Sequence, residues 1–255
     1  MNIDRKRVRE QFAAYTKNYD PDNTLIALKI IHTYKVADNC ECIAESLGLS
    51  DDDIEFSWLS GMLHDIGRFE QLRRYNTFVD AKSIDHAAFG ADLLFGEERL
   101  TDLFTDDRSI DDMLETVIRQ HNKYRIDENI TDKALMFCNI LRDADKIDIF
   151  RVIVDTPPEE LFNEPMEQLV TAEVTPSALE QVMAHQAVLR TPTLTTADRQ
   201  IGHIGMAFEL VYPKSRELTM EQGNLYKLFD FPTQNESMKN ALTVIRKEID
   251  LFFED

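Results

Sequence analysis

The dipeptide His64-Asp65 is the part of the sequence with the clearest potential for chemistry. A neutral imidazole and a carboxylate offer one nitrogen and one oxygen ligand, a set that suits Mn, Fe, Co, Ni or Zn better than Ca. Adjacent residues on a helix project about 100° apart, so both side chains can reach one ion only where the helix ends or bends. We expect such an end at Gly67. Alone, a His-Asp pair arises often by chance, so other residues must support it.

Further candidate ligands lie on the helices expected around this pair. His32 lies on the apolar stripe of the preceding helix, where an unpaired imidazole would be costly to bury. Asp145 lies in a strongly apolar helix, on the same side as Leu141. Asp143 is two residues away and points to a different face, so Asp145 is the better inward ligand.

The order of these residues resembles the HD-domain superfamily of metal-dependent phosphohydrolases. The matching residues are His32, then His64-Asp65, then Ala144-Asp145. His86 and His121 resemble the two extra histidines of dinuclear members. The resemblance covers about residues 32–145 and implies an all-α fold, an HD-domain helical bundle with additional C-terminal helices. His185 and His203 match nothing in it and are interpreted as surface or packing residues.

The resemblance also implies one or two divalent ions, with Mn, Fe, Mg, Co, Ni and Zn not distinguishable. One ion would bind His32, His64, Asp65 and Asp145. A second ion would bind His86 and His121, with Asp65 as a bridge between the two. Two ions would bring +4 against two carboxylates, so the site would be locally cationic in an acidic protein.

The activity that the resemblance implies is hydrolysis of a phosphomonoester or phosphoanhydride of a small molecule, with a nucleotide as the favoured class, by a metal-activated water. The catalytic candidates are Asp65 and Arg68. The candidates for binding the substrate are Arg68, Lys146, Arg119 and Lys123. No Gly-Tyr-Pro element follows His121, which excludes the HD-GYP subgroup. Two alternatives stay open, a di-iron HD-domain oxygenase and a non-catalytic nucleotide-sensing module.

The elements that must position these residues are predicted to be helices. Apolar residues recur at three- and four-residue steps from Leu25 to a stop at Gly48, and Asp22 or Asn23 could cap this helix. Ser50 caps a second helix that runs to His64, and a loop with short helical turns follows at 67–83. Further helices are expected at 84–95, 109–122 and 132–153, and three or four more lie after Pro157-Pro158, the last near 235–253. We therefore divide the chain into a metal-binding core, 1–156, with an N-terminal helix, and a C-terminal helical extension, 157–255.

The composition excludes several classes of protein. The 255 residues include 47 acidic and 28 basic side chains, a net charge of −19 that disfavours a nucleic-acid polymer or an anionic membrane as partner. No apolar run approaches the roughly 20 residues that span a bilayer. The three cysteines indicate reduced thiols and a cytoplasmic protein. The substrate is therefore expected to be a small molecule, and a homodimer is an option that the sequence leaves open.

Overall fold

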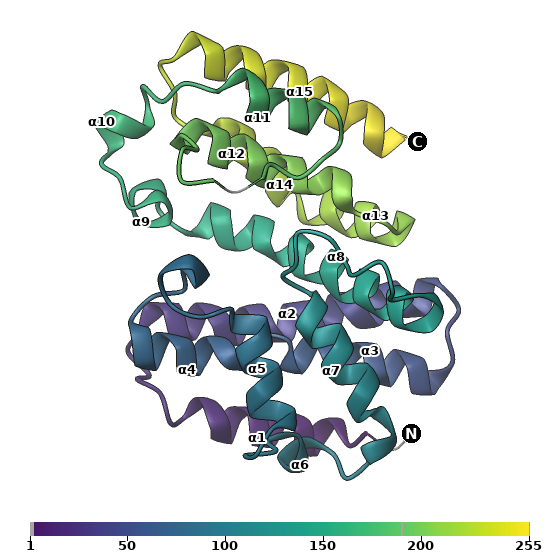
Figure 1. Ribbon diagram of the computed structural model, residues 1–255. Helices are drawn as coiled ribbons and strands as arrows, with labels where there is room; N and C mark the ends of the chain where they lie inside the picture. The colour runs from purple at the N-terminus through teal and green to yellow at the C-terminus, as the bar shows by residue number, and fades with distance from the viewer. Residues whose placement is uncertain (1–2, 190, 255) are drawn as a thin grey trace. The chain divides into compact units, whose positions relative to one another are not determined.

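The computed structural model describes residues 3–189 and 191–254, and within them every regular element is a helix, so the all-α prediction is confirmed (Figure 1). The chain divides into two compact units, residues 1–145 and 146–255, with the boundary inside α8. The predicted division at 157 falls at the break between α8 and α9 and stays a prediction. The elements up to that break are α1 (Arg5–Thr16), α2 (Thr24–Ser46), α3 (Asp51–Leu63), α4 (Ile66–Tyr75), η1 (Asp80–Lys82), α5 (His86–Phe95), α6 (Thr101–Phe104), η2 (Arg108–Ile110), α7 (Asp111–Gln120) and α8 (Asp132–Asp155).

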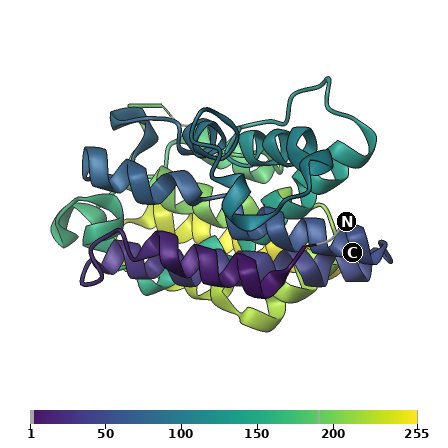
Figure 2. The same ribbon diagram turned by 90° about the horizontal axis from the view of Figure 1, so that it is seen from below.

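Helices α2 and α3 begin at side chains that cap them. The Asn23 side chain accepts hydrogen bonds from the first turn of α2, and Ser50 caps α3, as predicted. α1 packs on α3 and α6 and faces the viewer in Figure 2. The packing of α2 against α3 and of α5 against α4 and α7 then brings together residues that are far apart in sequence.

A single glycine sets the distance between α2 and α3. A Cβ atom placed on Gly61 would lie 2.6 Å from the Cα of Ala37 and 2.8 Å from its backbone nitrogen. The two helix backbones therefore touch directly at this level. Since Gly61 lies one turn before His64, and Ala37 lies on the helix that carries His32, this contact brings the two histidines close together.

The prediction of a loop over 67–83 is wrong for its first half. Residues 66–75 form α4, which ends at the left-handed Asn76, and the short helix η1 follows. The periodicity was masked because polar Glu70 and Gln71 are buried beside the apolar Ile66, Phe69 and Leu72. Gly67 does not end a helix; it lies inside α4.

Gly67 instead allows α4 to approach α5. A Cβ atom on Gly67 would lie 2.5 Å from the carbonyl oxygen of His86 and 2.7 Å from the backbone nitrogen of Gly90. No side chain fits between the two backbones. The start of α5, with His86 as its first residue, is thereby held beside the start of α4.

Helix α4 is also tied to α1 by a polar chain. The Tyr15 hydroxyl donates to the Ile66 carbonyl at 3.2 Å, and the Tyr19 hydroxyl lies 2.7 Å from that of Tyr15. Glu70, only 4% exposed, accepts hydrogen bonds from Arg73 and Arg74. Burial raises the pKa of Glu70, but the two arginines outweigh burial and lower it below its ordinary value. The buried carboxylate is therefore ionised at neutral pH.

The second unit contains more helical segments than the three or four that we predicted. Those of eight residues or more among the described residues are α11 (Pro176–Met183), α12 (Thr196–Gly205), α13 (Pro213–Gln222) and α15 (Glu236–Glu254). The shorter ones are α9 (Pro158–Phe162), α10 (Met166–Leu169), η3 (Met206–Glu209), α14 (Asn224–Lys227) and η4 (Leu228–Asp230). Four-residue helices are too short to give a periodic signal in the sequence.

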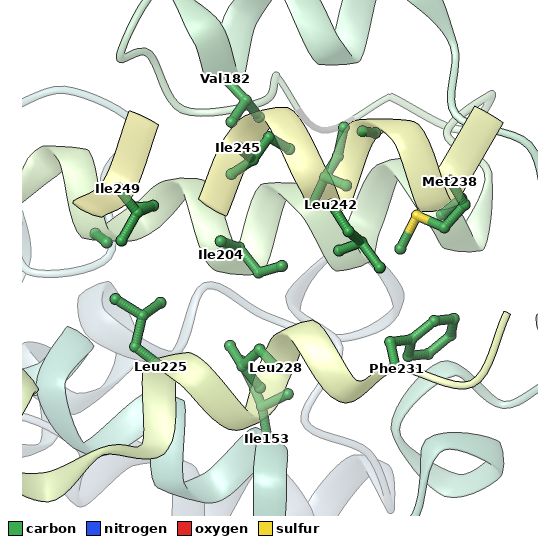
Figure 3. Packing of buried hydrophobic residues seen from close by; sticks show 14 of the residues in the cluster. Ile153, Val182, Ile204, Leu225, Leu228, Phe231, Met238, Leu242, Ile245 and Ile249 are labelled. Atoms are coloured by element: carbon green, nitrogen blue, oxygen red, sulfur yellow. The ribbon is translucent and has the colours of Figure 1, made fainter. Parts of the chain in front are cut away.

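The second unit has its own apolar core (Figure 3). α15 presents Met238, Leu242, Ile245 and Ile249 at three- and four-residue steps, so one face of the helix is buried. Among the described residues of both units, no helix is long and apolar enough to span a bilayer. Cys40 and Cys138 are buried thiols outside any disulfide, as predicted.

Replacing Gly61 with alanine should destabilise the first unit. The added methyl group meets backbone atoms of Ala37 that cannot rotate away, so we expect a loss of about 1–3 kcal/mol in the free energy of unfolding, the usual cost of overpacking. Urea unfolding followed by circular dichroism measures it.

The matched control is Gly202→Ala in α12. There the new Cβ atom would meet only the Val188 side chain, at 3.3 Å, and alanine favours a helix. This variant should be at least as stable as the original protein. Equal stability of the two variants would contradict the direct backbone contact at Gly61.

Replacing Glu70 with glutamine should destabilise the protein in a pH-dependent manner. A carboxyl whose pKa is lowered by folding stabilises the native state above its unfolded pKa, about 4.3, and loses this contribution as the pH falls through the folded value. The difference in unfolding free energy between the original protein and Glu70→Gln should therefore be constant from pH 7 to 5 and shrink below about pH 4. Glu98→Gln, at an exposed carboxylate, is the control. A difference that persists unchanged to pH 3 would refute the ionic role of Glu70.

Candidate metal centre

His64 and Asp65 lie at the break between two helices. α3 ends at Leu63, α4 begins at Ile66, and the backbone of Asp65 leaves the helical conformation with φ −104° and ψ 16°. The turn lets both side chains point into the first unit, where His64 is 0% and Asp65 2% exposed. The expected end of the helix is therefore present, but it lies at Leu63, before the His-Asp pair, and not at Gly67.

The carboxylate of Asp65 lies between two pairs of histidines. Its Oδ2 atom is 3.5 Å from Nε2 of His32 and 3.4 Å from Nε2 of His64. Its Oδ1 atom is 3.5 Å from Nε2 of His86 and 3.8 Å from Nε2 of His121. Each oxygen thus faces its own pair of imidazoles, which is the arrangement that a bridging carboxylate requires.

The two groups of side chains fit divalent ions. The ligand atoms of His32, His64 and Asp65 lie within 4.8 Å of one another, and so do those of Asp65, His86 and His121. Nδ1 of His64 and Nδ1 of His121 donate to the carbonyl oxygens of Gly61 and Ile118, each at 2.7 Å. The Nε2 atoms of neutral rings with these tautomers carry lone pairs and can act as ligands.

The distances between imidazoles support this fit. Nε2 of His86 is 3.0 Å from Nε2 of His121, and Nε2 of His64 is 3.4 Å from Nε2 of His32. Two lone-pair nitrogens at such distances repel each other unless a proton or a cation lies between them. Burial and the neighbouring imidazoles lower the pKa of His121 to about 3, so this ring is neutral at physiological pH. A metal cation satisfies both nitrogens at once.

Asp145 adds a second carboxylate on the His32 side. Its Oδ1 atom lies 3.1 Å from Nε2 of His32 and 3.8 Å from Nε2 of His64. Burial raises the pKa of Asp145, but the His32 and His64 rings outweigh burial and lower it. Two imidazoles and two carboxylates therefore converge on this side, with the mixed nitrogen and oxygen ligands that first-row transition metals bind.

The pKa of Asp65 shows how strongly the centre attracts positive charge. Burial raises this pKa, yet Lys29 and His64 bring it well below its ordinary value. In the opposite direction, burial lowers the pKa of His64, but the carboxylate of Asp65 outweighs burial and raises it. A fully buried carboxylate that remains ionised needs cations around it.

Two basic side chains flank Asp65, one at each oxygen. Nζ of Lys29 lies 2.5 Å from Oδ2, and Nε of Arg68 lies 3.7 Å from Oδ1. Arg68 is the predicted catalytic and substrate-binding residue, and the structure places it at the centre. Its Nη1 atom donates to Gln71, the Phe78 carbonyl and Asp80, while its buried Nε has no hydrogen-bond partner among the described residues.

The other three basic candidates are engaged elsewhere. Arg119 pairs with Asp92 and Glu115 and donates to the Ala88 carbonyl. Lys123 pairs with Asp85 at 2.5 Å. Lys146 belongs to the second unit, where its Nζ lies 3.5 Å from Glu209. The substrate-binding role of these three residues stays a prediction.

Sequence reasoning missed three residues that shape the centre. Lys29 lies three residues before His32, on the same face of α2, a spacing that could have revealed it. Asp80 lies 2.6 Å from Nδ1 of His86, in a segment without periodicity. Arg142 donates to the carbonyl oxygens of Gln120 and His121, which holds the end of α7 in place.

Comparison with known proteins agrees with this geometry. The family model of the HD domain matches residues 30–151, the segment that carries all six candidate ligands. Residues 30–151 form an HD domain. HD domains bind divalent metals, and the family consists generally of metal-dependent hydrolases. No curated protein and no solved structure matched the chain.

Two variants of the HD domain should distinguish the shared ligand from an unshared one. Asp65→Asn keeps the shape but removes the charge that faces both histidine pairs, so binding of both ions should weaken. His86→Ala removes a ligand from one side only and should leave one ion bound. Calorimetric titration with Mn²⁺ measures the stoichiometry. If Asp65→Asn still binds two ions with unchanged affinity, Asp65 is not a bridge.

Proposed function

We propose that this protein is a metal-dependent phosphohydrolase that cleaves a phosphomonoester or phosphoanhydride bond of a small molecule, with a nucleotide as the favoured class. The observation that carries the proposal is the position of Asp65, whose two oxygens face separate imidazole pairs. In this proposal His32, His64, Asp65 and Asp145 would hold one ion. His86, His121 and Asp65 would hold the other.

Bound divalent ions would supply a water of lowered pKa as the nucleophile and would neutralise charge on the phosphate oxygens. On the side with Asp65, His86 and His121, the described residues offer three protein ligands, which would leave coordination positions for water or substrate. The side chains of the domain then need only to orient the phosphate. No protein nucleophile is required for this chemistry.

Arg68 is the side chain best placed to bind the phosphate. Three acceptors hold its Nη1 atom, so the guanidinium has a fixed orientation. Its buried Nε–H donates to no acceptor among the described residues, and Nε lies 3.7 Å from Oδ1 of Asp65. A phosphate oxygen beside Asp65 would satisfy this donor with a charge-assisted hydrogen bond.

Lys29 provides a second positive charge on the opposite oxygen of Asp65. The Lys29 side chain is 14% exposed, and its Nζ lies 2.5 Å from Oδ2. Lys29 and Arg68 lie 5.9 Å and 5.6 Å from the ring of half-buried Phe78, so an aromatic surface adjoins both cations. Since aromatic rings stack on nucleobases, this surface supports a nucleotide as substrate class.

The test is metal analysis of the purified protein followed by a panel of phosphate esters and anhydrides. We expect hydrolysis that depends on Mn²⁺ or another divalent ion and stops when a chelator removes it. His64→Ala should lose metal and lower kcat/KM by about 1,000-fold or more, because the metal contributes several kcal/mol of transition-state stabilisation. Circular dichroism should show that the helices remain.

The control is His203→Ala, which removes a histidine stacked on Phe162 in the second unit. It should leave hydrolysis unchanged. Oxygen consumption with bound iron and no phosphate release would identify an oxygenase instead. Nucleotide binding without turnover in the presence of each metal would identify a sensing module. Either result contradicts the proposal.

A further inference from the structure

The carboxylate of Asp80 connects a candidate metal ligand with the candidate phosphate-binding residue. Its Oδ2 atom lies 2.6 Å from Nδ1 of His86, and its Oδ1 atom accepts a hydrogen bond from Nη1 of Arg68 at 2.7 Å. Gln71, which is fully buried, donates to the same Oδ1 at 3.0 Å. The His86 and Arg68 side chains thereby share one acceptor group.

His86 needs this partner because of its position in its helix. His64 and His121 follow the ends of α3 and α7, so their Nδ1 atoms donate to carbonyl oxygens three residues earlier in those helices. His86 is the first residue of α5 and has no preceding helical turn. A side chain from outside the helix must accept its proton.

The segment that carries Asp80 is fixed to α4. The side-chain nitrogen of Gln71, Nε2, donates to the Ser83 hydroxyl at 2.9 Å and to the Ile84 carbonyl at 3.0 Å, in addition to its hydrogen bond to Asp80. Asp80 itself begins the short helix η1. The half-buried acceptor is therefore held in place by the buried side chain of Gln71.

Asp85 is the neighbouring carboxylate and has a different structural role. Its Oδ1 atom caps α5 by accepting from the backbone of Ala87 and Ala88, and its Oδ2 atom pairs with Lys123. Although Asp80, Asp85 and His86 lie close together, Asp80 is the carboxylate that bonds to Nδ1 of His86. The two acidic residues can therefore be separated by mutation.

We propose that Asp80 is a positioning residue that holds His86 in the Nδ1–H tautomer, so that Nε2 faces Asp65 and His121, and that fixes Arg68 at the same time. The inference rests on the proposed metal centre and deepens it. A carboxylate behind a ligating histidine orients the ring and raises its basicity, and its removal generally costs about 10- to 100-fold in metal affinity. Asp80 thus controls the affinity of one of the two ions.

The experiment is calorimetric titration of the full chain with Mn²⁺, combined with ¹⁵N NMR of the histidine side chains. In Asp80→Ala, the weaker class of ion should bind about 10- to 100-fold less tightly than in the original protein, while the other class is unchanged. The NMR signals of His86 should report Nδ1–H in the original protein and a shift toward Nε2–H in Asp80→Ala. A purely structural role would not move the tautomer. Thermal unfolding confirms that the variant is folded.

Two controls separate Asp80 from its neighbours. Asp85→Asn removes one negative charge nearby but keeps a helix-capping side chain, so the affinity for both ions should stay within about threefold. Arg68→Ala removes the other ion-pair partner of Asp80 and should not weaken Mn²⁺ binding, because it takes a positive charge away from Asp65.

The inference is overturned if Asp80→Ala leaves both affinities and the His86 tautomer unchanged, or if Asp85→Asn has the same effect. These outcomes are distinct from failure of the proposed function. An original protein that binds two Mn²⁺ ions but hydrolyses no phosphate would contradict the phosphohydrolase, and the affinities would still test Asp80. An original protein that binds no metal contradicts both.

Discussion

The structure of the first unit depends on one buried carboxylate. Asp65 is 2% exposed and remains ionised, a state that costs several kcal/mol unless positive groups surround it. Lys29 and Arg68 supply positive charge at its two oxygens, and four imidazoles face the same oxygens from α2, α5 and the ends of α3 and α7. The carboxylate therefore determines which elements must meet at this point.

To bring these residues together, two pairs of helices must approach more closely than ordinary side chains permit. Gly61 allows α3 to touch α2, and Gly67 allows α4 to touch α5. Larger residues at either position would move His32 away from His64, or His86 away from Asp65, by part of an ångström or more. Metal-binding geometry tolerates little displacement, so the two glycines connect helix packing directly to the function of the site.

The candidate ligands could be predicted from the sequence, whereas much of their surroundings could not. His32, His64, Asp65, His86, His121 and Asp145 are recognisable because residue type and order carry the signal, and the structure brings all six together. Arg119 and Lys123 were also chosen by residue type and position. Only the packing reveals that Arg119 forms ion pairs with Asp92 and Glu115, and Lys123 with Asp85. α4 was missed because buried Glu70 and Gln71 interrupt its apolar pattern. Asp80 belongs to a segment whose position is set by hydrogen bonds to the side chain of Gln71 in the preceding helix, and no periodic pattern encodes it.

The net charge of −19 has little bearing on the centre. Lys29 and Arg68 offset the charges of Asp65 and Asp145, and two divalent ions would make the site cationic.

The central claim is that Asp65 is shared by two metal ions, and its most direct test is anomalous diffraction from crystals grown with Zn²⁺. We expect two peaks, each about 2.0–2.2 Å from a different oxygen of Asp65. A single peak, or two peaks of which only one contacts Asp65, would contradict the account.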